Sequence, residues 1–265
     1  MHFYKYQGTG NDFILLDNRG HNWQERLTQA DIARLCDRRF GIGADGLILL
    51  SDPKASDFRM IYYNSDGNPS TMCGNGGRCL VAFAHRVGAI GEGECSFEAI
   101  DGLHRARLQA DGQVELEMIR PQGWQQLSEQ EFWLDTGSPH YVRFGVEDLA
   151  ALDVDTEGRQ IRHSEVFAAI GGTNVNFVDV RAENRLQVRT FERGVEAETL
   201  SCGTGVTACA YVHLRQQKRN ERELTVSLDT PGGTLQVRVF DLMGPKEEVW
   251  LIGPATAVFE GNIDH

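Results

Sequence analysis

The sequence predicts an α+β protein built from two similar halves. Strand-like segments outnumber helical ones along the 265 residues, and hydrophobic residues make up 41% of the chain, which is enough for a core. Two of the three helical segments follow nearly identical motifs, which suggests an internal duplication. These motifs are Met72-Cys73-Gly74-Asn75-Gly76 and Ser201-Cys202-Gly203-Thr204-Gly205.

The predicted strands alternate apolar and polar residues or are rich in β-branched and aromatic residues. Turn signals such as Asp111-Gly112 and Pro231-Gly232-Gly233 separate several of them. The predicted strands cover 2–7, 12–17, 47–51, 57–64, 94–100, 103–109, 113–119, 140–144, 174–181, 185–192, 223–229, 233–240 and 247–252.

Three helices are predicted. The first covers 28–39 and begins with a capping box, in which Thr28 is followed three residues later by Asp31. The second begins at the Cys73 motif and ends at Gly88, with an apolar face made of Leu80, Val81, Phe83, Ala84 and Val87. The third begins at the Cys202 motif and ends within 215–219, with an apolar face made of Val206, Ala210, Val212 and Leu214.

The two halves superpose with a shift of 129 positions (202 minus 73), which also places Arg86 on Arg215. A second similarity, between 10–14 and 174–178, needs a shift of 164 and implies about 35 extra residues in the first half, including the 28–39 helix. Chance similarity of two glycine turns is the alternative, but two similarities in the same order favour duplication. We expect an N-terminal half at 1–120, a C-terminal half at 121–253, and a strand at 254–265 that returns to the first half.

Composition argues against several classes of function. The net charge is −12 without a basic run, which argues against nucleic acid and anionic membranes as partners. We find no apolar stretch of membrane-spanning length and no signal-peptide pattern. The six cysteines show neither a disulfide framework nor zinc-ligand spacing, so we expect no metal and a cytoplasmic location with free thiols.

A cysteine at a helix start is chemically useful. The positive end of the helix favours the thiolate, and its backbone N–H groups can bind a carboxylate. Two such cysteines on opposite sides of one carbon would be a proton donor and a proton acceptor. They could therefore invert a stereocentre, with the helix starts stabilising the charge that develops on the carboxylate. No cofactor is then needed, and no clear pyridoxal-phosphate signature is present.

Each thiol also has a purely structural interpretation. A single cysteine is often a small buried hydrophobic residue, and we keep this interpretation for Cys36, Cys79, Cys95 and Cys209. It explains Cys73 and Cys202 less well, because both stand at the same place in matching motifs.

Four separated blocks of the chain resemble the diaminopimelate epimerase family. They are residues 6–13, Asn64-Ser65-Asp66-Gly67, residues 72–79, and Glu192-Arg193-Gly194 followed by 201–205. The resemblance implies two similar halves, each a β-barrel-like sheet wrapped around a central helix, with the active site in the cleft between them. It implies a homodimer that interconverts LL- and meso-diaminopimelate, a small amino-acid substrate on the route to lysine and peptidoglycan, without cofactor or metal.

The resemblance also implies roles for individual residues. Cys73 and Cys202 would be the acid–base pair, and His140 and Glu192 would tune the cysteine pKa. The reacting carboxylate would be bound by backbone N–H groups of Gly74, Asn75, Gly203 and Thr204. Glu192 would also meet the adjacent ammonium group, and Arg193 would bind the distal carboxylate through its planar fork. Asn11, Asn64 and Asn176 would hold the rest of the distal end.

Alternative interpretations remain open. Asn11 and Asn176 could be turn residues, Glu192 and Arg193 an exposed pair, and His140 a surface residue at a strand end. Ser138 stands where the family often has asparagine, and Gly46 where it often has glutamine, so we assign Gly46 no side-chain role. A racemase for a proline derivative, or a non-enzymatic amino-acid binder, could use the same helix starts.

Overall fold

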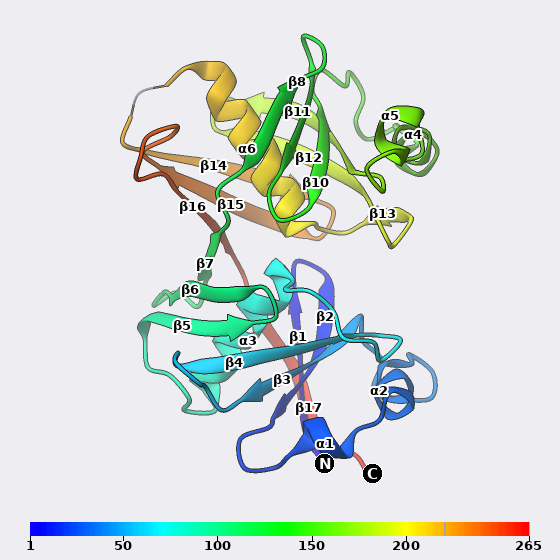
Figure 1. The fold of residues 1–265 in the computed structure, drawn as a ribbon, viewed down its shortest axis with the longest axis vertical. Coiled ribbons are helices and arrows are strands. Elements are labelled where there is room, and N and C mark those ends of the chain that lie inside the picture. Colours follow the sequence, from blue (N-terminus) through cyan, green and yellow to red (C-terminus); the bar gives the residue numbers. More distant parts are fainter. Residues whose placement is uncertain (220, 265) are drawn as a thin grey trace. The chain divides into compact units, whose positions relative to one another are not determined.

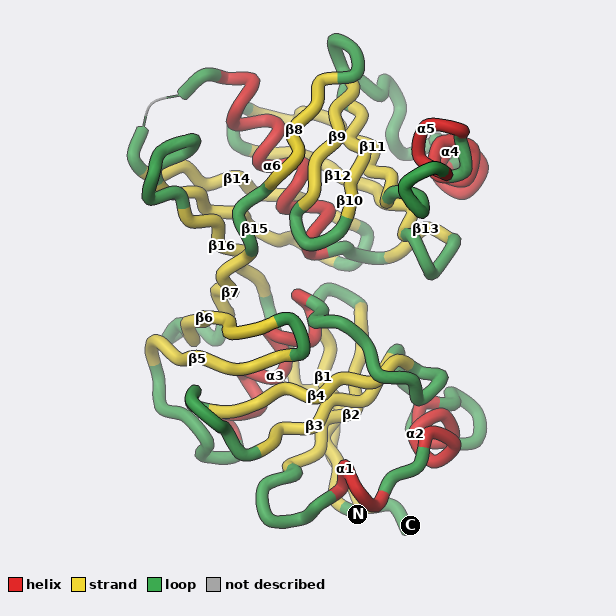
Figure 2. Tube along the Cα trace, viewed as in Figure 1, coloured by secondary structure: helices red, strands yellow, loops and turns green. Residues whose placement is uncertain are grey.

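The structure is a computed structural model that describes residues 1–219 and 221–264, and the chain forms two compact units (Figure 1). The N-terminal unit comprises residues 1–116 together with the C-terminal segment from Gly253, and the C-terminal unit comprises Glu117–Ile252. Strands dominate both units, and each also has helices (Figure 2). The α+β class and the two halves are therefore confirmed.

The N-terminal unit is built on one curved sheet. Its strands pair in the order β17, β1, β2, β3, β4, β5, β6 and β7, and only the β2–β3 and β4–β5 pairs are parallel. The strands are β17 (Thr256–Asn262), β1 (His2–Gly8), β2 (Asn11–Asp17), β3 (Gly46–Ser51), β4 (Phe58–Asn64), β5 (Gly93–Ala99), β6 (Gly102–Leu108) and β7 (Val114–Met118).

The C-terminal unit repeats this arrangement. Its strands pair in the order β8, β9, β10, β11, β12, β14, β15 and β16, and here only β10–β11 and β12–β14 are parallel. The strands are β8 (Gln122–Gln126), β9 (Glu131–Asp135), β10 (Pro139–Arg143), β11 (Asn174–Ala182), β12 (Arg185–Glu192), β14 (Glu223–Thr230), β15 (Gly233–Phe240) and β16 (Glu248–Gly253). A short strand, β13 (Ala197–Thr199), adds to β12.

The shared pairing order makes the elements of the two units equivalent. Strand β2 corresponds to β10, β3 to β11 and β4 to β12, and their first residues differ by 128 (139 minus 11), 128 (174 minus 46) and 127 (185 minus 58). The shift near 129 therefore holds from β2 to β4, and it holds for the central helices as well, whose first residues differ by 129 (203 minus 74). The second similarity, with its shift of 164, was wrong because it compared β2 with β11, which occupy different places in their sheets. The first half has no 35 extra residues.

A central helix lies inside each sheet. Helix α3 (Gly74–Arg86) packs against β1, β2, β3, β4, β6 and β17, and α6 (Gly203–Gln217) packs against β9, β10, β11, β12, β14 and β15. In Figure 1, α6 crosses its unit with strands around it. The predicted apolar faces were too narrow, because α6 is buried on nearly every side from Gly205 to Leu214. Each large apolar side chain buried here stabilises the fold by about 1.5–3 kcal/mol.

Small residues let α3 approach the sheet closely. A Cβ atom on Gly76 would lie 2.9 Å from the Cδ1 atom of Ile48, and one on Gly77 would lie 3.1 Å from the Cε atom of Met72. A larger residue at either position would have to displace the ends of these side chains. The glycines of the Cys73 motif therefore serve packing as well as access to the backbone.

The outer helices were only partly predicted. Helix α2 (Gln29–Cys36) begins with the predicted capping box, because the Thr28 hydroxyl accepts from the Asp31 N–H group and the Asp31 carboxylate accepts from the Thr28 N–H group. Helices α1 (Trp23–Arg26), α4 (Val154–Arg162) and α5 (Glu165–Ala168) were missed. Within α4 only Val154 and Gly158 are buried, and the segment contains few apolar residues from which a sequence pattern could be recognised.

Strands β8, β9 and β13, which sequence patterns missed, all lie in the C-terminal unit. Strand β8 has mostly exposed residues, and β13 has only three residues. Strand β9 does alternate, with Phe132 and Leu134 buried, but it is only five residues long. Short or polar strands like these are recruited by their neighbours in the sheet.

Candidate active site

Cys73 is the N-cap residue of α3. Its backbone is extended, with φ −113° and ψ 125°, and its side chain does not cap the helix. The first turn of α3 contains no acidic residue. Because a helix leaves its first N–H groups without intrahelical acceptors, this end is suited to bind an anion beside the thiol.

Cys202 occupies the same position on α6. Its φ is −115° and its ψ is 111°, its side chain likewise does not cap the helix, and no acidic residue lies in the first turn. Cys202 is 7% exposed, whereas Cys73 is half-buried. Each unit therefore presents one thiol at the positive end of its central helix.

A network of carboxamides lies beside Cys73. The sulfur is 3.6 Å from the Asn11 Oδ1 atom, which also accepts from the Asn75 Nδ2 atom at 3.4 Å. Asn11 donates from its Nδ2 atom to the Asp45 carboxylate at 2.6 Å. Asn75 accepts on Oδ1 from the Arg78 guanidinium at 3.0 Å. Asn11 and Asn75 thus lie next to the predicted catalytic sulfur.

A different set of side chains lies beside Cys202. Its sulfur is 3.4 Å from the Thr204 hydroxyl, and this hydroxyl is 2.9 Å from the His140 Nε2 atom. The other ring nitrogen of His140, Nδ1, is 3.1 Å from the Asn176 Nδ2 atom. His140 is therefore no surface residue: it is fully buried and connected to Cys202 through one hydroxyl.

The two surroundings occupy equivalent positions. Asn75 and Thr204 each lie two residues after the cysteine, and Asn11 and His140 each lie near the start of the equivalent strands β2 and β10. The duplication has therefore kept the positions of the polar groups and changed their chemistry.

His140 stays neutral. Burial, together with the smaller effect of the nearby positive charge of Arg193, lowers its pKa from 6.5 to about 3. The imidazole therefore acts as a neutral hydrogen-bond donor or acceptor near pH 7. An imidazolium ion at this position would need a buried counter-charge, and the two ring nitrogens contact Thr204 and Asn176 instead.

Glu192 and Arg193 lie at the end of β12. The Glu192 carboxylate accepts from the Thr199 hydroxyl at 2.9 Å, and the Arg193 backbone N–H group donates to the Asn174 Oδ1 atom at 2.9 Å. The Arg193 side chain is exposed, and its guanidinium has no hydrogen bond or ion pair to any residue of 1–219 or 221–264. Asn64 is exposed at the end of the equivalent strand β4.

Asn176 was expected to reach the substrate, but the structure gives it another position. It is fully buried, its Nδ2 atom donates to the Tyr141 carbonyl at 2.8 Å, and its Oδ1 atom accepts from the Thr190 hydroxyl at 3.0 Å. Together with its contact to His140, these bonds occupy the carboxamide on both sides. Asn176 therefore orients His140 from behind.

Asn174 is a residue that the sequence reasoning missed. Its Nδ2 atom donates to the Ser138 hydroxyl at 2.8 Å and to the Pro139 carbonyl at 2.9 Å, while its Oδ1 atom holds the Arg193 backbone. Ser138 thus contacts a carboxamide through its hydroxyl. The available signal was the alternation along β11, which places Asn174 and Asn176 on the same face of the strand.

Gly46 is required by its neighbours. A Cβ atom there would lie 2.5 Å from both the Tyr62 Cε2 atom and the Tyr63 carbonyl oxygen. No side chain fits without a shift of the backbone, which agrees with assigning this residue no side-chain role.

The other four cysteines are buried free thiols. Burial raises the pKa of Cys36, Cys79 and Cys95 to about 12 and raises that of Cys209 well above its usual value. They are therefore protonated near pH 7 and act as small hydrophobic residues.

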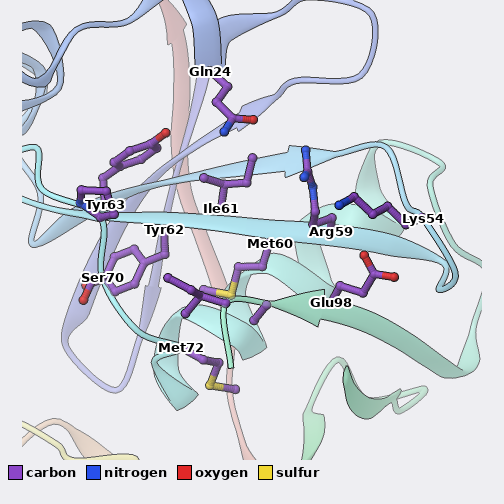
Figure 3. A pocket seen from close by; sticks show the side chains of 13 residues that line it. Gln24, Lys54, Arg59, Met60, Ile61, Tyr62, Tyr63, Ser70, Met72 and Glu98 are labelled. Carbon is purple, nitrogen blue, oxygen red and sulfur yellow. The ribbon is translucent and has the colours of Figure 1, made fainter. Parts of the chain in front are cut away.

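A cavity of about 390 Å³ lies along β4 in the N-terminal unit (Figure 3). Its lining includes Lys54, Arg59, Tyr62, Met72 and Glu98. Met72 directly precedes Cys73, but none of the predicted site residues lines this cavity. Among residues 1–219 and 221–264, no helix is long and apolar enough to cross a membrane, and no group of three His, Cys, Asp or Glu residues is arranged to hold a metal ion.

Comparisons with known proteins agree with the four sequence blocks. The family model described as diaminopimelate epimerase matches residues 3–123 and 132–258. The chain is 47% identical to a diaminopimelate epimerase of Flavobacterium psychrophilum, over 99% of this chain and 100% of the relative. It is 45% identical to a diaminopimelate epimerase of Chlorobaculum tepidum, over 97% of this chain and 98% of the relative.

Solved structures support the fold. A phenazine biosynthesis protein of the PhzF family from Bacillus anthracis matches with a TM-score of 0.77 at 14% identity, covering 100% of this chain and 99% of that one. A probable proline racemase from Agrobacterium radiobacter matches with a TM-score of 0.68 at 16% identity, covering 99% of this chain and 92% of that one. Likeness at these identities concerns the fold alone. Because the family model and the relatives at 45–47% identity cover nearly all of this sequence, the chain belongs to the diaminopimelate epimerase family.

Proposed function

We propose that the chain interconverts LL- and meso-diaminopimelate by a two-base mechanism in which Cys73 and Cys202 act on one α-carbon. The observation that carries this proposal is the repetition of one arrangement, a thiol at the positive end of a buried helix, at equivalent places in the two units. The names of the relatives at 45–47% identity supply the substrate.

The proposed reaction moves one proton onto a sulfur and another off a sulfur. A thiolate removes the α-hydrogen as a proton, and the electron pair stays on the carbon and spreads into the carboxylate. The opposite thiol then gives its proton to the other face of the carbon. The product is inverted, and the negative charge has moved from one sulfur to the other, so no redox step is involved.

The helix starts would stabilise the intermediate. Backbone N–H groups of Gly74, Asn75, Gly203 and Thr204 would bind the carboxylate, whose negative charge grows as the proton leaves. The close packing of α3 on the sheet holds its donors rigidly, so little reorganisation is needed at the moment of reaction.

Polar groups at the ends of β4 and β12 would recognise the rest of the substrate. The exposed guanidinium of Arg193 suits the distal carboxylate, with Asn64 beside the same end of the molecule. Asn174 would fix the Arg193 backbone through its Oδ1 atom. The carboxylate of Glu192 would meet the ammonium group on the reacting carbon and favour the thiol form of a nearby cysteine.

An assay in D₂O tests the proposal. The purified chain should exchange the α-hydrogen of LL-diaminopimelate for deuterium and produce the meso isomer, whereas L-proline and hydroxyproline should remain unchanged. Cys73→Ala and Cys202→Ala should each abolish epimerisation, with Cys36→Ala as the matched control. Normal turnover by either active-site variant would refute the two-base mechanism, and turnover of proline would refute the substrate.

The assembly and location follow as parts of the same proposal. We propose a cytoplasmic homodimer, because the reaction needs reduced thiols and because β17 is an edge strand with Val258 and Phe259 exposed. Light scattering after gel filtration should give twice the chain mass, and Val258→Lys should shift it towards the monomer. A monomeric wild-type protein would contradict this assembly.

A further inference from the structure

The two thiols differ in the polarity of the group that faces them. Cys73 faces the Asn11 Oδ1 atom, and Cys202 faces the Thr204 hydroxyl. A carboxamide oxygen can only accept a hydrogen bond, whereas a hydroxyl can also donate one. Which side of the carboxamide faces Cys73 therefore decides what protonation state that sulfur favours.

Charged groups fix the Asn11 carboxamide. The Asp45 carboxylate can only accept, so the Asn11 nitrogen, 2.6 Å away, must face it. From the other side, the Arg78 guanidinium can only donate, so it faces the Asn75 oxygen and directs the Asn75 nitrogen towards Asn11. Both ends of the network point the Asn11 oxygen at Cys73. This oxygen accepts from an S–H group and repels a thiolate.

Neutral groups fix His140 with the opposite result. Asn176 donates to the Tyr141 carbonyl and accepts from the Thr190 hydroxyl, so its nitrogen also faces the His140 Nδ1 atom. Nδ1 must then be the acceptor, and the ring proton lies on Nε2, which donates to the Thr204 oxygen. The Thr204 hydroxyl hydrogen is left to point at Cys202, where it stabilises a thiolate.

Other ionisable groups near the two sulfurs also affect the protonation of each. Near Cys73 are the buried Arg78 guanidinium, which favours a thiolate, and the buried Cys79 thiol. Asp45 lies beyond Asn11 and is paired with Arg38. Near Cys202 are the buried thiol of Cys209 and the neutral His140, with Arg193 beyond it. The Glu192 carboxylate, which the proposed function places near a cysteine and which would favour a thiol there, accepts from the Thr199 hydroxyl. Arg78 acts on the Cys73 sulfur through space, whereas the Asn11 oxygen lies within hydrogen-bond distance of that sulfur, at 3.6 Å.

We propose that in the free enzyme Cys202 carries the thiolate and Cys73 the thiol, and that Asp45 and Asn176 are the positioning residues that set this difference. The inference rests on the proposed function for its meaning. In the resting enzyme Cys202 is then ready to accept a proton. One turnover leaves the negative charge on Cys73, where the thiolate is less favoured. A proton exchange between the two must restore the resting form.

Alkylation by iodoacetamide tests the assignment without substrate. The rate of modification of each cysteine is measured by mass spectrometry of its peptide between pH 5 and 10, in the Cys73→Ala and Cys202→Ala proteins. Each protein then reports one sulfur without the charge of the other. The midpoint for Cys202 should lie about one pH unit or more below that for Cys73. Equal midpoints, or the reverse order, would overturn the proposal.

Variants of the positioning residues separate this effect from a general loss of structure. Asp45→Asn allows the Asn11 carboxamide to rotate, so the Cys73 midpoint should fall while that of Cys202 stays. Asn176→Leu should raise the Cys202 midpoint and leave Cys73 unchanged. Two control variants should change neither midpoint: Asp57→Asn, in the same unit as Asp45, and Asn184→Ala, in the same unit as Asn176.

A second variant covers the case in which Asn176→Leu fails to fold. Thr204→Val removes only the hydroxyl that contacts Cys202 and should also raise the Cys202 midpoint. Shifts in both cysteines, or in neither, would contradict the assignment. A chain that epimerises with equal midpoints would refute this inference alone, and a chain with the predicted midpoints that does not epimerise would refute the proposed function alone.

Discussion

Arg78 is a buried cation that ties the first turn of α3 to its surroundings. It is 0% exposed, and its hydrogen bonds go to neutral oxygens on Thr9, Gly74, Asn75 and Pro254. Thr9 itself has a φ of 50°, a conformation that non-glycine residues rarely adopt. Arg78 therefore holds the strained β1–β2 turn that carries Asn11.

Replacing Arg78 with Met removes the charge and nearly preserves the volume. Only the bond to Asn75 is short, at 3.0 Å, and the others are 3.3–3.5 Å long. Each acceptor that loses its hydrogen bond therefore costs about 1 kcal/mol, the low end of the usual range, or roughly 4 kcal/mol for all four. Burial lowers the pKa of Arg78, so relief of its desolvation returns about 1 kcal/mol. The net loss is about 3 kcal/mol, or roughly 10 °C in Tm.

Urea unfolding followed by circular dichroism measures this loss. Arg86→Met is the matched control, because Arg86 lies on the same helix but is half-exposed and paired with Glu260 at 3.0 Å. Its removal should cost less than about 1 kcal/mol. If Arg78→Met were no more destabilising than Arg86→Met, the network around Arg78 would not be what stabilises the turn.

Three further predictions concern backbone space, acid stability and capping. Gly46→Ala should cost about 1–3 kcal/mol in the free energy of unfolding, and Tyr62→Ala should not rescue it, because the Tyr63 carbonyl still blocks the Cβ atom; Gly91→Ala, where nothing lies within 4 Å, should be neutral. His140 has a pKa of about 3 in the folded chain and near 6.5 when unfolded, so only the unfolded state gains its proton between these values, and stability falls as the pH drops through this window. His140→Gln should therefore remove about 2 kcal/mol of the destabilisation between pH 7.5 and 5 in urea titrations, and an unchanged pH dependence would contradict the buried neutral ring. Thr28→Ala should lower the free energy of unfolding by about 1 kcal/mol through loss of the capping box, whereas a change in the Cys73 alkylation rate would show that α2 matters for the site as well.

The central helices and most strands could be predicted because their signals are local. The period-2 pattern of β11 and the run of apolar residues in α6 are both visible in the sequence. Strand β8 could not be predicted, because its residues are mostly exposed and its place depends on the neighbouring strand. The correspondence of β2 with β10 was missed for a similar reason: it is defined by pairing, and residues 11–13 resemble those of β11 more closely than those of β10.

The site residues likewise include some that could be predicted from the sequence and some that could not. Cys73 and Cys202 could be singled out in the sequence because each precedes a glycine at a predicted helix start, and the structure places each at the N-cap of its helix. The role of Asn176 could not be predicted from the sequence, because a carboxamide at the start of a strand can form a turn, bind a substrate or orient a histidine equally well. Only the three-dimensional structure shows that Thr190 and Tyr141 occupy it on both sides and leave it to orient His140.

The two units share a pattern of positions and differ in chemistry, and the proposed substrate offers a reason. At a reacting carbon the two faces are alike, so each half can supply the same parts: a thiol and a helix start at Cys73 and at Cys202. The long arm of diaminopimelate leaves this carbon on one side only, so the equivalent positions at the strand ends cannot both bind it. There the first half has Asn64, and the second half has Arg193 with its exposed guanidinium. The units also differ beside the sulfurs, where Asn11 presents an acceptor to Cys73 and Thr204 a hydroxyl to Cys202, so discrimination of the substrate and unequal thiols both accompany the loss of symmetry between the units.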